Sequence, residues 1–376
     1  YDNAKTNWTT ISRHDGLVIF LEDFELFGNV EQAQNFLEYV KSGRFLFSFV
    51  MSYTETCEIP GITIAGADTN SMQYTPPADA EYLHYGYCKT IDNIPMTPDG
   101  KPTPGLLTKT ALESASIPHL TINAGSKITP QLPFIETGLS FGKNISVESA
   151  MTDSEVSAAV EYGRIVGRNM ASLTDCLVIG ESIPAGTTTA LAVLRAFDFD
   201  AKVSSSIPTN PTKLKNEIVD SALKRIDSKH PYSILATVGD PMIAFVAGML
   251  SSASSVSKVM LAGGTQMTAV LAFASKIGFN EENTAIGTTS YITNDQNANF
   301  TNLVKQIADI PAISVNPGLN NSKYPGLKAF SEGFAKEGVG AGGTIISSML
   351  KTGNDSSKFL NLAEQEYARL STLSNS

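Results

Sequence analysis

Cysteine and histidine are scarce in this sequence, and their spacing argues against the structural roles that both residue types often have. The three cysteines, Cys57, Cys88 and Cys176, stand far apart, and the four histidines form neither an HxH nor an HExxH pattern. A disulfide framework or a zinc motif needs several such residues at regular spacing. We therefore expect a reducing compartment, no structural metal and no metal ligand among the site residues.

Basic charge and long apolar runs are also lacking. The 376-residue chain has 27 Lys and Arg against 37 Asp and Glu, a net charge of −10, which argues against nucleic acid and anionic membranes as partners. No apolar run approaches the roughly 18 residues of a membrane span, and the first residues lack the order of a secretory signal. The expected location is the cytoplasm, and the length predicts one large domain or two.

Short apolar segments alternate with amphipathic ones, a pattern that is typical of βαβ units. The predicted strands cover residues 44–53, 120–123, 176–180, 258–262, 284–287 and 312–315. The predicted helices between them cover residues 103–116, 153–173, 187–197, 212–227, 242–252, 265–277 and 302–307. Because the strands are continuously apolar, the sequence predicts an α/β fold with a mostly parallel, Rossmann-like sheet and helices on both faces.

Two Pro/Gly-rich segments and the chain ends depart from this alternation. Residues 91–105 and 130–143 are predicted loops, the second long enough to reach over a site. Helices are expected at 30–41 and, near the other end, at 324–334, 341–351 and 356–371. The predicted organisation is an α/β domain over 42–320 that contains the cleft, with residues 1–41 and 321–376 forming a smaller helical lobe.

Three glycine-rich turns are the first candidates for chemistry: residues 180–189 (GESIPAGTTT), 262–265 (AGGT) and 337–344 (EGVGAGGT). Free backbone N–H groups in such turns bind anions, although tight connections need glycine in any case. None of the turns has a P-loop or dinucleotide pattern. Pro184 stands where a nucleophile elbow needs glycine, which argues against a serine hydrolase.

Two glutamates, Glu181 and Glu337, lie within these turns. Glycine and apolar neighbours can desolvate a carboxylate, which raises its pKa and makes it a better proton acceptor near neutral pH. The alternative, that each carboxylate caps a helix N-terminus, stays open. Lys213 and Lys215 are the candidate cations for a phosphate, unless they belong to a solvated helix face.

Several segments, in this order and at this spacing, resemble the nicotinate-nucleotide–dimethylbenzimidazole phosphoribosyltransferase family: GESIPAGTTTALAVL (180–194), GDPMIAFVAGML (239–250), VMLAGGTQMTAVLA (259–272) and KEGVGAGG (336–343). The segments YTPPADAEYLHYG (74–86) and TPDGKPTPGLLTKTALE (97–113) are similar to a divergent branch of that family. The resemblance covers most of the chain from about residue 45 onward.

The resemblance implies an enzyme that moves the 5-phosphoribosyl group of nicotinate mononucleotide onto a benzimidazole-like or purine base and releases nicotinate, in assembly of the cobamide lower ligand. Glu337 matches the catalytic glutamate of the family, which removes the proton from the acceptor base. The implied substrate-binding residues are Glu181, Ser182, Gly186, Thr187, Thr188, Lys215, Gly263, Gly264, Gly338 and Gly340. The family implies no cofactor, small-molecule substrates as partners and a homodimer. A candidate contact patch for that dimer consists of Tyr82, Tyr85 and Tyr87, unless these tyrosines line the intramolecular core or the acceptor pocket.

Two turns depart from the usual family pattern. The first glutamate is followed by Ser-Ile-Pro-Ala-Gly-Thr-Thr, and the usual Asp-Gly after the later strand is Ala262-Gly263. Both changes fall where the mononucleotide would bind, so they bear on the identity of the donor. Two alternatives to a transferase stay open: a non-catalytic protein that binds a nucleotide or cobamide precursor, and a nucleoside or nucleotide hydrolase, which the lack of an Asp cluster disfavours.

Overall fold

Parallel strands form the centre of the sheet in this computed structural model, which describes residues 8–13, 16–21, 23–64, 66, 70–92, 95–97 and 99–373. Across these residues the sheet has ten strands in the order β1-β2-β3-β10-β9-β8-β7-β4-β5-β6. The parallel strands are β4 (Phe45–Met51), β5 (His119–Asn123), β6 (Ile135–Glu136), β7 (Cys176–Ser182), β8 (Lys258–Ala262), β9 (Thr284–Thr289) and β10 (Ala312–Val315).

Apolar side chains alternate between the two faces of these strands, so each face has its own core. In β8, Val259 and Leu261 pack into one core, whereas Met260 and Ala262 pack into the other. Both faces of a strand with this pattern are removed from water, which is why the strands read as continuous apolar runs.

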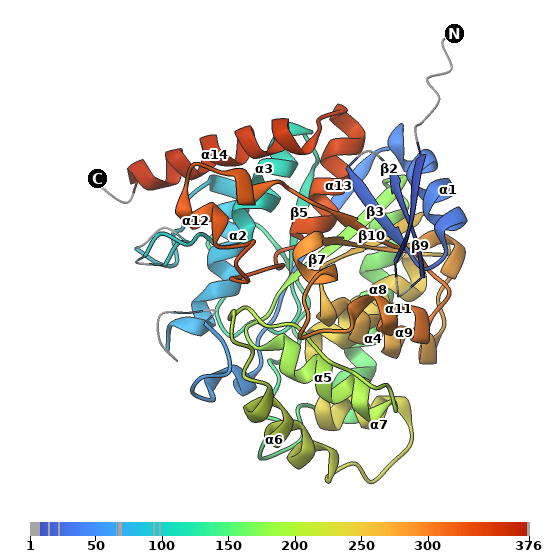
Figure 1. Cartoon of the computed structure of the whole chain (residues 1–376). Coiled ribbons are helices and arrows are strands. Elements are labelled where there is room, and N and C mark those ends of the chain that lie inside the picture. Colours follow the sequence, from blue (N-terminus) through green and yellow to red (C-terminus); the bar gives the residue numbers. More distant parts are fainter. Residues whose placement is uncertain are drawn as a thin grey trace.

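Helices cover both faces (Figure 1). The first core contains side chains of α4 (Asp153–Ala171), α5 (Gly186–Ala196), α6 (Thr212–Leu223), α7 (Pro231–Val238), α8 (Pro241–Ala253), α9 (Thr265–Ile277), α10 (Ser290–Thr293) and α11 (Phe300–Ile307). The second contains side chains of α1 (Val30–Lys41), α2 (Thr75–Tyr85), α3 (Gly105–Ser114), α12 (Pro325–Lys328), α13 (Ala341–Thr352) and α14 (Ser356–Leu373). The predicted fold class is thus confirmed.

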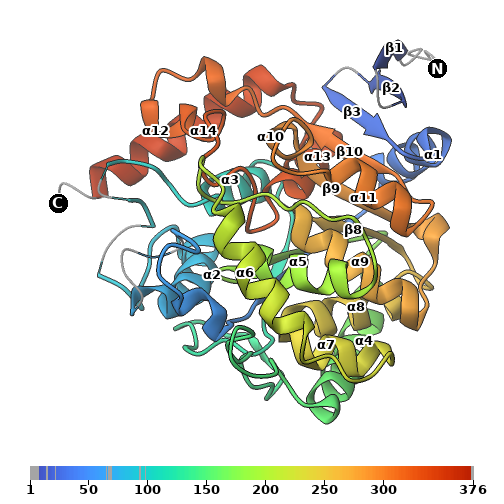
Figure 2. The same ribbon diagram turned by 60° about the horizontal axis from the view of Figure 1, so that its bottom comes forward.

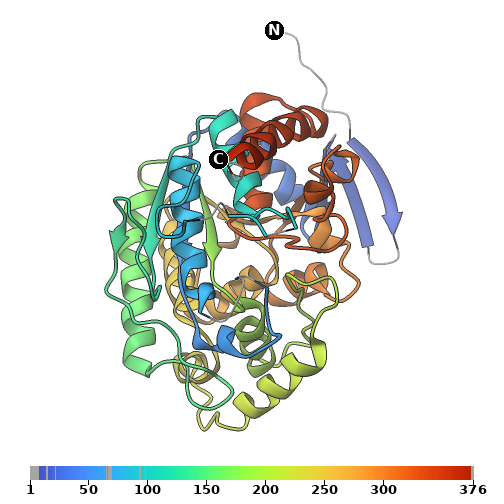
Figure 3. The same ribbon diagram turned by 90° about the vertical axis from the view of Figure 1, so that its left-hand side faces the viewer.

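The N-terminal segment corrects the prediction of a purely helical lobe. Residues expected in that lobe form the antiparallel strands β1 (Trp8–Arg13), β2 (Gly16–Leu21) and β3 (Phe24–Phe27), and β3 pairs with β10. Figures 2 and 3 show these blue strands at one edge of the molecule. Sequence-adjacent strands pair readily in hairpins, which a search for βαβ units does not detect.

The expected helix over 324–334 is also wrong over most of its length, because α12 ends at Lys328 and the chain then turns, with Gly333 at φ +99°. Helices α2 and α7 were not predicted. Both have proline in their first turn, a position where its missing N–H costs nothing. Helix α1 and the C-terminal helices do share one face, but α2 and α3 share it with them, so the division into two lobes stays a prediction.

Strands β4 and β7 mark a switch point in the topology. The chain runs from β4 outward to β5 and β6, then returns to β7 on the other side of β4 and continues to β8, β9 and β10. In open parallel sheets, the carboxyl ends of the strands at such a point form a crevice that binds ligands.

We find no helix in the described part of the chain that is both long enough and apolar enough to cross a membrane.

Candidate active site

A cavity of about 420 Å³ lies at the carboxyl ends of these strands. Glu181 and Ser182 end β7, and Gly264 follows β8, so all three line the cavity directly from the sheet edge. The loop that precedes α13 adds Glu337 and Gly338. All three glycine-rich turns, which the sequence places far apart, therefore line the same cavity.

Several residues of these turns adopt the left-handed backbone region. Val339 has φ +55° and Ala185, the N-cap of α5, has φ +59°. For a β-branched residue such as valine this conformation is strained, and it persists only where the surroundings fix it. The Val339 N–H donates to the Glu181 carbonyl at 3.0 Å, and the Val339 carbonyl accepts from Thr108 Oγ1 at 2.9 Å. Strain of this kind clusters at functional sites.

Backbone donors hold the Glu337 carboxylate. Oε2 accepts from the Thr289 N–H at 2.9 Å and from Thr288 Oγ1 at 3.3 Å, and Oε1 accepts from the N–H groups of Gly338 and Gly342 at 3.2 and 3.1 Å. Burial raises the pKa of Glu337 to about 7, although these hydrogen bonds oppose the shift. The carboxylate thus both lines the cavity and binds the Gly342 N–H in the first turn of α13, which is the capping arrangement left open by the sequence.

The surroundings of Glu181 are different, because acids rather than donors dominate them. Burial raises its pKa to about 8, and the negative charges of Asp240, Glu337 and Asp79 add to the shift, whereas the Ile183 N–H opposes it. Asp79 of α2 is itself buried, accepts from Thr103 Oγ1 at 2.7 Å and from Ser182 Oγ at 2.8 Å, and has its pKa raised to about 6 by burial. We call Asp79, Glu181 and Glu337 the carboxyl cluster.

One side of the cavity, here the polar wall, consists of Gly186, Thr187, Ser204, Ser205, Ser206, Gly264, Thr265, Gln266 and Lys336. Helices α5 and α9 both begin in it, and no described side chain caps either N-terminus. The two starts are adjacent, since a Cβ at Gly186 would lie 3.1 Å from Gln266 Nε2. Thr265 is 1% exposed, and its Oγ1 has no hydrogen-bond partner among the described residues. Uncapped helix N-termini attract anions.

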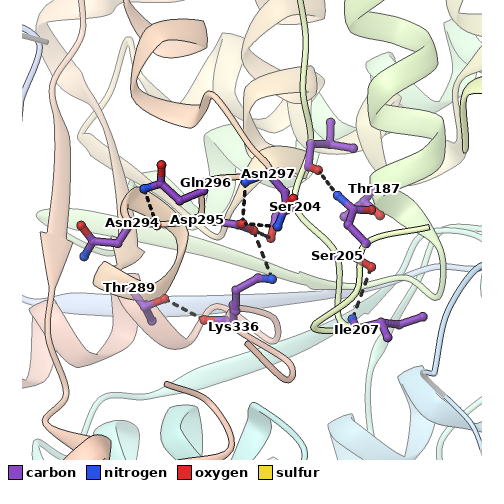
Figure 4. A network of polar contacts seen from close by, with 12 residues as sticks. Thr187, Ser204, Ser205, Ile207, Thr289, Asn294, Asp295, Gln296, Asn297 and Lys336 are labelled. Carbon is purple, nitrogen blue, oxygen red and sulfur yellow. Dashed lines mark hydrogen bonds and ion pairs between the residues drawn. The ribbon is translucent and has the colours of Figure 1, made fainter. Parts of the chain in front are cut away.

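Two buried lysines support the polar wall. Lys215 Nζ donates to Thr187 Oγ1 at 3.0 Å and to the Ser204 carbonyl at 2.8 Å. Lys336 Nζ pairs with Asp295 at 3.1 Å, and Ser204 Oγ donates to the same carboxylate at 2.7 Å (Figure 4). Burial, followed by repulsion from Lys336, lowers the pKa of Lys215 to about 7.

A second group of lining residues comes from residues 62–104 and is largely apolar. Its apolar members, here the apolar wall, are Ile62, Ile64, Tyr74, Ala78, Ile91, Pro95, Met96, Pro102 and Pro104, and the same segments also contribute the polar residues Thr63, Ser71, Thr75, Asp79, Thr97, Lys101 and Thr103. The apolar wall draws on the predicted loop over 91–105, which includes a bridge between Met96 and Pro102. The segment over 130–143, expected to reach over a site, contributes no lining residue within the described structure and contains β6. The hydrogen bond from Ser182 to Asp79 joins the apolar wall to the sheet edge.

Most of the residues predicted for the site line this cavity: Glu181, Ser182, Gly186, Thr187, Gly264, Glu337 and Gly338. The others lie behind it. Lys215 supports Thr187, and Gly263 donates its N–H to the Gly287 carbonyl at 3.0 Å. Gly340 caps α13 at φ +75° and packs against Gly180, where a Cβ would lie 3.1 Å from the Gly180 Cα. Thr188 is fully buried.

Sequence reasoning missed Asp79, the serines at 204–206, Thr265, Gln266 and Lys336. Two of these carried a usable signal. Asp79 is an acid within the otherwise apolar and small stretch Pro76 to Ala80, and Lys336 precedes Glu337 in a motif that the resemblance already covered. Serines in a loop carry no such signal.

The tyrosines of the candidate contact patch do not line the cavity in the described structure. Tyr82 is fully buried and donates to Glu366 at 2.6 Å. The rings of Tyr85 and Tyr87 stack with centroids 5.6 Å apart, and Tyr87 is 46% exposed. Across the residues that the structure describes, no group of three or more His, Cys, Asp and Glu side chains is arranged to hold a metal ion.

The chain is similar to several known proteins. Residues 120–291 match the family model described as Phosphoribosyltransferase. The UPF0284 protein of Archaeoglobus fulgidus is 45% identical over 328 residues, which cover 87% of this chain and 94% of that protein. The UPF0284 protein of Sulfurisphaera tokodaii is 41% identical over 335 residues, with coverage of 88% and 95%.

Solved structures extend the comparison to the fold. The nicotinate-nucleotide-dimethylbenzimidazole phosphoribosyltransferase of Thermus thermophilus superimposes with a TM-score of 0.57 at 16% identity, covering 85% of this chain and 83% of that one. A structure of CobT from the same organism gives a TM-score of 0.55 at 16% identity, with coverage of 88% and 91%. At this identity the likeness concerns the fold.

Proposed function

The chain belongs to the UPF0284 proteins, a divergent branch of the phosphoribosyltransferase family, and on that premise we propose that it transfers the 5-phosphoribosyl group of nicotinate mononucleotide to a ring nitrogen of a benzimidazole-like or purine base, releasing nicotinate. This reaction would contribute the base and ribose of a cobamide lower ligand. The proposal concerns donor, acceptor and residue roles, which the family alone does not specify.

The observation that carries the proposal is the division of the cavity into walls of opposite character. The polar wall offers two uncapped helix N-termini, hydroxyl groups and a lysine, which suit a phosphate. The apolar wall suits the flat face of a heteroaromatic base. The carboxyl cluster lines the same cavity as both walls, so it is available to the ribose and to the reacting nitrogens.

The proposed reaction needs a base more than an acid. A ring nitrogen of the acceptor attacks C1′, the C1′–N bond to the pyridinium breaks, and its electron pair returns to the ring nitrogen. Nicotinate then leaves with an uncharged ring and its carboxylate. The proton on the other acceptor nitrogen passes to Glu337. A pKa of about 7 suits a base at neutral pH. The Thr288 hydroxyl, at 3.3 Å, is the donor that can rotate away to free a lone pair on Oε2.

A second candidate is a non-catalytic protein that binds a nucleotide or cobamide precursor in this cavity. The specific observation in its favour is that both oxygens of Glu337 already accept backbone N–H groups, as a purely structural cap would. Under this hypothesis the carboxylate stabilises α13 and takes no proton.

The deciding experiment mixes the protein with nicotinate mononucleotide and a panel of bases and measures nicotinate release. Release that requires an added base supports the transferase. Binding of the mononucleotide without release, whatever base is added, supports the non-catalytic alternative. Release that proceeds equally well without a base indicates hydrolysis and would overturn the transferase.

We also propose that the protein forms a homodimer, as the family resemblance implies. The exposed ring of Tyr87, stacked on Tyr85, supports a contact in this region because aromatic side chains are enriched in the cores of interfaces.

A further inference from the structure

Lys215 and Lys336 approach the polar wall, and they differ in what their ammonium groups face. A third lysine, Lys101, also lines the cavity, but its ammonium group pairs with Asp99 and lies over the Phe334 ring. Lys215 is 1% exposed, does not line the cavity, and donates to Thr187 Oγ1 and to the Ser204 carbonyl. Both acceptors belong to residues of the polar wall, so this lysine links the start of α5 to the loop that contains Ser204. Lys336 does line the cavity, and its pairing with Asp295 leaves further donors on the ammonium.

Asp295 is built to hold Lys336. Their side chains are 4% and 7% exposed, and the carboxylate also accepts Ser204 Oγ at 2.7 Å and the Asn297 N–H at 3.0 Å. Burial alone would raise the pKa of Asp295, but the Ser204 hydroxyl, the Asn297 N–H and Lys336 together lower it below its usual value. The aspartate is therefore charged at neutral pH, beside a wall that otherwise favours anions.

The loop that carries Lys336 also carries Glu337, and the end of β9 fixes both. Thr289 Oγ1 donates to the Lys336 carbonyl at 2.7 Å (Figure 4), and the Thr289 N–H donates to Glu337 Oε2 at 2.9 Å. One strand end thus sets the position of the lysine in the polar wall and of the glutamate in the carboxyl cluster.

We propose that Lys336, rather than Lys215, is the cation that directly contacts the 5′-phosphate, and that Asp295 competes with the phosphate for it. This inference rests on the proposed function, since it assigns a ligand to the donor's phosphate. Lys215 is a positioning residue, which holds Thr187 and Ser204 in place for the same anion. The competition follows from charge: a phosphate monoester carries about −1.5 to −2 at neutral pH, so the Asp295 carboxylate next to it opposes binding while its pairing holds the lysine ready.

The test measures the binding of ribose 5-phosphate by calorimetry, with unphosphorylated ribose as the companion ligand. Lys336→Gln should weaken the binding of ribose 5-phosphate about 10- to 100-fold, because a charge-assisted hydrogen bond is lost. Asp295→Asn should tighten it about threefold or more, because a like charge is removed. Asparagine keeps an oxygen for the Asn297 N–H, and the Ser204 hydroxyl can accept from its amide group, so only the ion pair with Lys336 is lost.

The opposite signs of these two effects separate the proposal from a structural role of the ion pair. If the pair only holds the loop together, both variants weaken binding, and the proposal is overturned. It is equally overturned if Lys336→Gln or Asp295→Asn leaves the affinity unchanged. If Lys336→Gln does not fold, Asp295→Asn decides alone, with tighter binding as the supporting result. The matched control is Lys213→Gln on α6, whose side chain is 93% exposed, and it should bind like the wild type.

These outcomes are separable from those of the proposed function. Ribose 5-phosphate contains neither nicotinate nor an acceptor base, so a lysine-dependent affinity for it can be found even if nicotinate mononucleotide is never turned over. Conversely, if nicotinate release depends on an added base and Lys336→Gln does not change it, the transferase function is supported and Lys336 is rejected as the residue that contacts the phosphate.

Discussion

The carboxyl cluster and Lys215, which supports the polar wall from behind, respond to burial in opposite directions. Burial raises the pKa of Glu181 to about 8, of Glu337 to about 7 and of Asp79 to about 6. It lowers the pKa of Lys215 to about 7. Asp295 differs from all of these, because its hydrogen bonds and Lys336 outweigh burial and lower its pKa.

The difference teaches that a buried group keeps its charge only where partners compensate for the lost water. Acids that face acids, such as Glu181, retain protons at neutral pH, whereas an acid that faces a lysine stays ionised. The cavity therefore holds fewer charges than its sequence suggests, and the remaining charge is set by neighbours. Substitution of single residues, in the carboxyl cluster or among the lysines, tests this comparison.

The largest effect is expected at Glu337. Glu337→Gln keeps the shape of the side chain but cannot take a proton, so kcat should fall about 10²- to 10⁴-fold. Glutamine also has one acceptor oxygen instead of two, so either the Thr289 N–H or the N–H groups of Gly338 and Gly342 lose their partner, and Tm should fall by a few degrees. Steady-state kinetics and thermal unfolding measure the two effects. Near-wild-type turnover in the folded variant would reject Glu337 as the general base.

Lys215 tests the other side of the comparison. Lys215→Met should weaken the binding of nicotinate mononucleotide about tenfold, because Thr187 and Ser204 lose their common donor. Lys213→Met, at the exposed neighbouring position, is the control.

The pH profile of the same binding experiment distinguishes charge from packing. The charges that face Lys215 are Lys336 and Asp295, and a bound phosphate would raise its pKa above about 7. The contribution of Lys215 should therefore be complete below pH 7 and decline as the pH rises above it. The variant should show no decline from this source. Parallel pH profiles for wild type and variant would mean that Lys215 acts by packing alone.

A smaller effect, on stability, is expected at Glu181. The unfolded chain releases this proton near pH 4.5, whereas the folded protein keeps it to about pH 8, so ionisation removes stability between these values as the pH rises. Glu181→Gln mimics the protonated acid and should gain stability relative to the wild type from pH 5 to pH 8. Urea unfolding across this range measures the difference, with Glu161→Gln on the exposed surface of α4 as control. A constant difference at all pH values would contradict the assignment.

The smallest effect on ligand binding is expected at Tyr87, because this residue lines neither the polar wall nor the apolar wall. Light scattering should give about twice the 40.1 kDa mass of one chain, and Tyr87→Ser should lower that mass without changing ribose 5-phosphate affinity. A wild-type mass of one chain would remove the homodimer, and an unchanged dimer in the variant would remove Tyr87 from its interface.

The sequence identifies the parallel core of the fold because its signals are local. Strand β8 has the bounds that were predicted, Lys258–Ala262, since a continuous apolar run between turn signals is visible in the residues themselves. The strands β1 to β3 were not predicted, because they join the sheet through their pairing partners and not through a pattern of their own. Glu181 and Glu337 were identifiable because acids within glycine-rich turns stand out, whereas Ser204 and Thr265 do not.

By itself the sequence determined the class of fold, the glycine-rich turns and the two glutamates, because composition, periodicity and motif order are properties of neighbours along the chain. Only the tertiary structure decided that Lys336 lines the cavity and Lys215 does not, since the two are 121 positions apart and their exposure depends on how α6 and the loop before α13 pack. It likewise decided that Asp79 joins the carboxyl cluster, because the hydrogen bond to Ser182 links residues that are distant in sequence and adjacent only after the sheet has formed.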